Sequence, residues 1–159
     1  NMHFLGCETF FEIFKDLRKL NDIANRKKLN VLIKLHPNIS YLKNELSKEF
    51  FFLNFSNEKI EKLLRETNAT LSFSSTTIED SLCSKIPVIL IDQWLRFQHC
   101  VAEKNLSKKN KAVYYINDIE DLPKVVKNIN SSKRINFHDY TFGNNINFNI
   151  KELTKKLLQ

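Results

Sequence analysis

The chain has 159 residues, of which 42% are hydrophobic and 27% are charged, values typical of one soluble globular domain and unlike those of a disordered chain. Its net charge of +7 suits an anionic partner, but charge alone does not distinguish nucleic acid, a membrane surface and a phosphorylated substrate. Only two glycines occur, which excludes both the P-loop and the glycine-rich dinucleotide fingerprint.

No apolar run reaches the roughly 20 residues that cross a bilayer, and the first residues lack the pattern of a secretion signal. The three cysteines, Cys7, Cys83 and Cys100, are odd in number and have no metal-ligand spacing. We therefore expect reduced thiols, no metal site and a cytoplasmic location, with the inner face of the membrane as a second candidate. The densest lysine groups contain no interleaved aromatic residues, so nucleic acid is not expected as a partner.

Hydrophobic spacing predicts helices and strands that alternate along the chain. Residues 2–5 are expected to form a short strand, and apolar residues at helical spacing predict a helix over 9–24. The later elements, in chain order, are a strand at 30–35, a helix at 40–48, a strand at 51–55, a helix at 60–67, a strand at 69–73, a helix at 77–83, a strand at 87–91, a helix at 94–104, a strand at 112–116 and helices at 122–129 and 150–157.

This alternation predicts an α/β fold, because parallel neighbouring strands need helical crossovers. We expect a Rossmann-like three-layer domain, with a mostly parallel sheet covered by helices on both faces, that includes all of residues 1–159. Ligands of such sheets bind beyond the carboxyl ends of the strands. Candidate site residues are therefore sought after positions 35, 73, 91 and 116.

Four consecutive hydroxyl residues, Ser74 to Thr77, follow the strand predicted at 69–73 and lead directly into a helix. A helix start exposes unpaired N–H groups, and hydroxyls add further donors, so this turn suits a phosphate. Thr76 and Glu79 have the spacing of a capping box, which explains two of these residues without a ligand. The phosphate hypothesis therefore depends mainly on Ser74 and Ser75.

Asp80 lies one turn into the same helix, where a carboxylate could accept hydrogen bonds from ribose hydroxyls, and Glu79 is the neighbouring alternative. For either acid, a favourable charge near a helix start is an equal explanation. His36 follows another predicted strand, where Pro37 fixes the turn and Lys34 adds positive charge. Its imidazole could donate to a phosphate, and a purely structural histidine is an equal alternative.

Two further strand ends carry polar residues. After the strand at 87–91, Asp92 and Gln93 are candidates for contact with a sugar or base. At the end of the strand at 112–116, Asn117 and Asp118 are most simply a turn that leads into the next helix.

Taken in order, these motifs resemble the C-terminal, donor-binding domain of GT-B glycosyltransferases. The segment SSTTIEDSLCSKIP at 74–87 is similar to that family's turn, acid-bearing helix and proline-initiated strand, and Asp80 falls seven residues before the proline. KLHP at 34–37, together with the Ser-Ser turn, is similar to motifs of bacterial sialyltransferases, capsule transferases and CDP-glycerol glycerophosphotransferases. DQWLRFQHCVAEKNL at 92–106 and AVYYINDIEDLPKVV at 112–126 resemble the tail of the family.

The resemblance implies the donor-binding half of a glycosyltransferase for surface polysaccharides, with a CMP- or CDP-activated donor favoured over UDP and no metal or other cofactor. It assigns binding of the donor phosphates to His36, Ser74, Ser75 and Thr76. It assigns ribose binding to Asp80 or Glu79, and contact with the sugar or base to Asp92 and Gln93. Glycines of that family are absent here, one being replaced within Ser84-Lys85-Ile86 and another missing near 105–110.

A complete GT-B enzyme also has an acceptor domain, which 159 residues cannot include, so the catalytic base is not identified. The expected partners are the nucleotide-activated donor and the missing acceptor domain or a partner subunit, with a membrane surface as a further candidate. Three other functions remain open: a UDP-sugar transferase, a fragment of a nucleotide-sugar 2-epimerase, and a non-catalytic interaction module derived from either.

Overall fold

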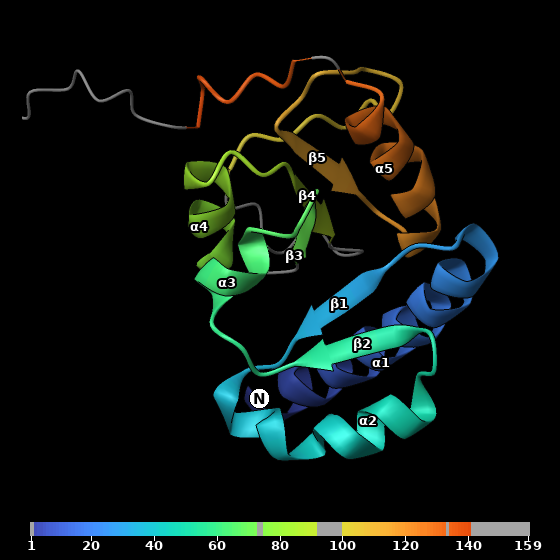
Figure 1. Ribbon diagram of the computed structural model, residues 1–159. Helices are drawn as coiled ribbons and strands as arrows, with labels where there is room; N and C mark the ends of the chain where they lie inside the picture. Colours follow the sequence, from blue (N-terminus) through green and yellow to red (C-terminus); the bar gives the residue numbers. More distant parts are fainter. Residues whose placement is uncertain (1, 73–74, 92–99, 133, 141–159) are drawn as a thin grey trace, which may run out of the picture.

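The computed structural model describes residues 2–72, 75–91, 100–132 and 134–140, which form an α/β fold (Figure 1). The elements in chain order are α1 (Met2–Lys27), β1 (Val31–Lys34), the 3-10 helix η1 (Pro37–Leu42), α2 (Lys43–Glu49), β2 (Leu53–Ser56), α3 (Ile60–Leu64), β3 (Thr70–Ser72), α4 (Thr77–Cys83), β4 (Val88–Ile91), β5 (Val113–Ile116), the 3-10 helix η2 (Ile119–Asp121) and α5 (Leu122–Asn130).

All described strands pair in parallel, as predicted, but they form two small sheets. One sheet has the order β1-β2, with Val31 opposite Leu53. The other has the order β3-β4-β5, with Ile89 opposite Leu71 on one side and Tyr114 on the other. The described residues therefore form an α/β fold with short parallel strands in two small sheets.

Strands β4 and β5 are buried along their whole length, which explains why both read as continuous apolar runs in the sequence. Alternate residues of the two strands enter two different hydrophobic clusters. Ile89, Ile91, Tyr114 and Ile116 belong to the first cluster, which also contains buried residues of α1, α2 and α5. Residues of opposite parity, such as Val88 and Tyr115, belong to the second cluster with Ile78 and Leu82 of α4. Strands β4 and β5 are therefore packed on both faces.

The prediction of a strand at 2–5 was wrong, because α1 is one continuous helix from Met2 to Lys27. Gly6 is the single glycine of α1, which contains no proline, and an interior glycine costs a helix only about 1 kcal/mol. The helix ends at Lys28, whose φ of 54° is left-handed, where the Leu29 N–H donates to the Ala24 carbonyl at 3.1 Å.

The prediction of a helix at 94–104 was wrong over its last five residues, while 92–99 lie outside the described part of the chain. Glu103 is extended and forms a parallel bridge with Tyr114. Its N–H donates to the Val113 carbonyl at 3.0 Å, and its carbonyl accepts from Tyr115 N–H at 3.0 Å. Pairing with the free edge of β5 therefore takes the backbone bonds that a helix would have used.

Smaller differences affect helix boundaries. The helix predicted at 40–48 begins earlier as a 3-10 turn, because Pro37 occupies the first position of η1 and α2 follows from Lys43. The helix predicted over 60–67 ends at Leu64, and the Thr67 hydroxyl donates to the Leu63 carbonyl at 2.7 Å instead of continuing it. The helix predicted at 150–157 lies outside the described residues.

Candidate functional site

The first candidate turn begins at the carboxyl end of β1. Leu35 is buried and its N–H donates to the Ser56 carbonyl at 2.9 Å, which holds the end of β1 against β2. His36 then adopts an extended conformation and is exposed, and its Nδ1 accepts the Asn38 N–H at 3.2 Å. An imidazole whose Nδ1 is an acceptor carries its proton on Nε2 when it is neutral. The free edge of His36 therefore presents an N–H donor to solvent.

The second candidate turn follows β3, and here the structure corrects the predicted capping box. Thr76 has helical backbone angles and its side chain makes no capping hydrogen bond. Ser75 performs that function, because its Oγ accepts both the Thr77 N–H at 3.2 Å and the Thr77 Oγ1 hydroxyl at 3.0 Å. The residue that tests the phosphate hypothesis is thus also the one that stabilises the start of α4. Ser74 lies outside the described residues.

The two candidate ribose acids lie together in the first turn of α4, where both are exposed. Burial raises the pKa of the Cys100 thiol, and the charge of Glu79 raises it further. No hydrogen bond or ion pair between described residues joins His36 to these acids or to Ser75. Asp92 and Gln93 lie outside the described residues.

The turn between α4 and β4 shows how the chain does without a glycine that the resemblance expects. Lys85 has a left-handed φ of 58°, the conformation that most often selects glycine at the end of a helix. Its N–H donates to the Leu82 carbonyl at 3.0 Å, and the Ile86 N–H donates to the Ser81 carbonyl at 2.8 Å. These bonds complete a Schellman motif around a lysine. Asn110, with φ of 62°, has the same conformation in the region where the second glycine is missing.

Asp118, at the end of β5, forms a turn as predicted and also binds α1. Its carboxylate accepts the Glu120 N–H at 3.0 Å, and both of its oxygens lie 2.9 Å from Lys19 Nζ. The backbone hydrogen bond, followed by the Lys19 ammonium, lowers the pKa of the Asp118 carboxyl. The hydrogen bond to the Asp118 carboxylate in turn raises the pKa of Lys19.

Asp118→Asn is expected to lower the free energy of unfolding at pH 7 by less than about 1 kcal/mol, because solvent screens a half-exposed ion pair. The pKa of Asp118 is lower in the folded chain than in the unfolded chain. Its contribution is therefore complete above about pH 4 and is lost as the pH falls through the folded pKa. Urea unfolding of the wild-type chain and of Asp118→Asn should show that the difference between their free energies of unfolding falls toward zero as the pH is lowered.

The matched control is Asp139→Asn, whose carboxylate is 77% exposed and lies 3.8 Å from the His138 ring, and it should change stability little at any pH. If the Asp118→Asn difference kept its full size well below pH 3, the ion pair and the carboxylate cap would not be its cause.

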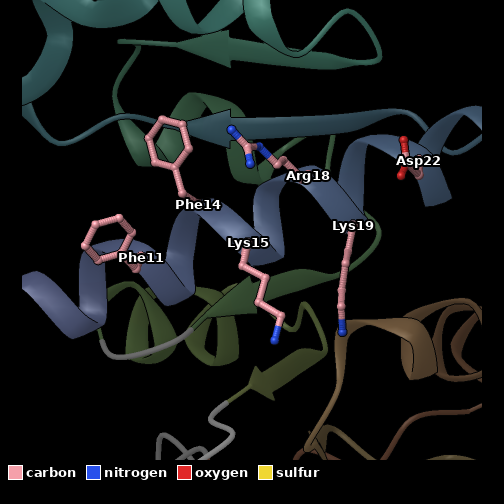
Figure 2. A pocket seen from close by; sticks show the side chains of 6 residues that line it. All are labelled: Phe11, Phe14, Lys15, Arg18, Lys19 and Asp22. Atoms are coloured by element: carbon pink, nitrogen blue, oxygen red, sulfur yellow. The ribbon is translucent and has the colours of Figure 1, made fainter.

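A surface pocket of about 460 Å³ on α1 contains none of the predicted site residues (Figure 2). Figure 2 shows Lys15 and Lys19 extending to one side of the helix and Phe14 and Arg18 to the other. Lys19 is paired with Asp118, and Arg18 lies 3.8 Å from Glu49. The residues that line this pocket recur at helical spacing along α1. This spacing is visible in the sequence, but it is equally typical of an ordinary solvated helix face.

Within the described ranges, no helix is long and apolar enough to cross a membrane. The same residues contain no group of three or more His, Cys, Asp or Glu side chains that could hold a metal ion.

Comparison of the chain with protein-family models, with curated proteins and with solved structures found no match of any kind. The resemblance to glycosyltransferases therefore depends on the sequence motifs alone.

Proposed function

We propose that the chain is the donor-nucleotide-binding half of a glycosyltransferase for surface polysaccharides, using a CMP- or CDP-activated donor. The observation that carries this proposal is the strand order. One small sheet has the order β1-β2 and the other has the order β3-β4-β5. If the two small sheets are parts of one sheet with the order 2-1-3-4-5, the connections change direction between β1 and β3.

The distribution of helices supports this arrangement. With right-handed crossovers, the order 2-1-3-4-5 requires α2 on one face and α3 and α4 on the other. Residues of α1, α2 and α5 share the first hydrophobic cluster, whereas α4 belongs to the second and contacts α3. We therefore propose the three-layer, Rossmann-like form of the fold.

In open parallel sheets, ligands bind at the carboxyl edge where the connections change direction. In this arrangement the segments at that point would be His36-Pro37 after β1 and the residues between β3 and α4, which include Ser75 and Thr76. Both retain hydrogen-bond donors, because His36 Nδ1 and Ser75 Oγ already accept bonds from their own turns. Donors without competing acceptors suit phosphate oxygens.

In this proposal His36, Ser74, Ser75 and Thr76 bind the donor phosphates, Asp80 or Glu79 binds the ribose, and Asp92 and Gln93 contact the sugar or base. The turns would stabilise the charge that develops on the departing phosphate. Transfer itself also requires an acceptor domain or partner subunit to supply a base. The 159 residues are therefore expected to bind the donor without turning it over.

The test is a calorimetric titration of CMP, CDP and UDP into the wild-type chain, His36→Ala and the double variant Ser74→Ala/Ser75→Ala. Loss of a hydrogen bond to a charged group costs about 1.5–3 kcal/mol. Each variant should therefore bind CMP or CDP at least about tenfold more weakly. Wild-type affinity in both variants would refute the proposal.

Two controls separate binding from folding. His138→Ala removes another exposed histidine and Ser131→Ala another exposed serine, and neither should alter nucleotide affinity. Because Ser75 caps α4, its removal should also cost about 1 kcal/mol of stability. Circular dichroism must therefore show that the double variant is folded at the titration temperature.

The Ser75 cap also favours a second candidate, the non-catalytic interaction module, because it gives this serine a purely structural role. That function predicts no binding of any of the three nucleotides at millimolar concentration.

A further inference from the structure

A shallow groove of about 470 Å³ lies between the end of α1 and the exposed side of α5. Leu29, Pro123 and Val126 form its apolar part, and Lys27 and Lys127 border it, together with Asn130 and Ser131. The last turns of α1 lie beside α5 in Figure 1. Leu29 lies two residues before β1 and His36 two residues after it, so this groove and the proposed donor site lie at opposite ends of that strand.

Lysine side chains border the groove on both of its helices. Both chain segments that form it are free of acids, since no Asp or Glu occurs at 23–44 or at 122–138. Arg26 is paired with Glu120 at 3.1 Å. Four lysines at or beside the groove form no ion pair with any described residue: Lys27, Lys28, Lys124 and Lys127. Favourable charge at a helix end contributes to the positions of Lys27 and Lys127. Leu29 and Val126 pack partly against the first hydrophobic cluster, and the rest of their surface lines the groove.

We infer that this groove is a docking surface for an anionic membrane. Lysine side chains extend their ammonium groups to lipid phosphates while their methylene stems lie along apolar surface. Leu29, Pro123 and Val126 provide such a surface between the lysines. No aromatic side chain of the described residues lines the groove to stack on bases, so its composition fits lipid headgroups better than single-stranded nucleic acid.

Docking through this groove would hold the molecule by the amino end of β1. The turn at His36, at the carboxyl end of the same strand, would then remain free of the membrane surface. The inference does not depend on the proposed nucleotide site, because the two surfaces share no residue.

The test is co-sedimentation of the whole chain with phosphatidylglycerol-containing vesicles and with pure phosphatidylcholine vesicles in low salt. Binding should occur only to the anionic vesicles and should be lost at high salt. Each lysine near an anionic surface contributes about fivefold to the bound-to-free ratio, so Lys27→Ala/Lys127→Ala should lower it about 25-fold. Lys27→Glu/Lys127→Glu should abolish binding.

Lys43→Glu/Lys48→Glu is the matched control, because both α2 lysines are exposed and unpaired among the described residues, and the charge change is identical. This control should keep most of the binding. Equal loss in both charge-reversal variants would show that net charge alone acts and would overturn the inference. The inference would also be overturned if the chain bound RNA through Lys27 and Lys127 and did not bind the vesicles.

Discussion

Phe50→Ala should lower the free energy of unfolding by about 3–5 kcal/mol, a large part of the stability of a domain of this size. The Phe50 side chain is 1% exposed in the first hydrophobic cluster. Its ring lies 5.7 Å from that of Phe14 on α1 and 6.3 Å from that of Phe55 on β2. Truncation would leave a cavity where three elements meet, and chemical denaturation monitored by circular dichroism measures the loss.

Phe51→Ala is the control, since the neighbouring ring is 80% exposed and its removal should change stability by no more than about 0.5 kcal/mol. Similar losses in the two variants would mean that α2 does not pack on the sheet through Phe50.

Leu82→Ala is expected to cost about 2–5 kcal/mol by opening a cavity in the second cluster. Leu82 is 5% exposed and joins α4 to Val88 and Leu90 of β4. If residues 1–159 form one domain, the loss should appear as a shift of the same cooperative transition that Phe50→Ala shifts. Far-UV circular dichroism and fluorescence of Trp94, the single tryptophan, provide two probes of that transition.

Cys83→Ala changes the next, exposed residue and should have little effect. Two separate transitions, one sensitive to Phe50→Ala and the other to Leu82→Ala, would contradict the expectation of a single domain.

The sequence predicted the buried strands and α4 well, because local pattern and tertiary packing agree there. The apolar runs at 88–91 and 113–116 are buried on both faces, and α4 has the predicted bounds, Thr77–Cys83. The strand predicted at 2–5 failed because a four-residue stretch with three apolar residues fits a helix equally well. The helix predicted over 100–104 is not formed, because the pairing of Glu103 with β5 is a long-range contact that no local pattern reveals.

For the candidate site, the sequence located the turns but not the role of each side chain. Ser75 and Thr76 are adjacent hydroxyl residues, and either could cap α4 by spacing alone. Only the backbone angles show that Thr76 is already helical and that Ser75 accepts the bonds. The cationic groove has residues from segments about 100 positions apart, so its lysines could only be read singly as solvated side chains.

The hydrogen bonds inside the two candidate turns also set a polarity for anything that approaches them. Ser75 Oγ accepts two bonds and His36 Nδ1 accepts one, which leaves the Ser75 O–H and the His36 Nε2–H as donors. Such groups discriminate by the direction of the bond, since they can donate to an oxygen but offer little to an ammonium group or a metal cation. A nucleoside without phosphates would leave these donors unused, so in the proposed site discrimination between nucleotide and nucleoside would come from the two side chains that the turns hold in place.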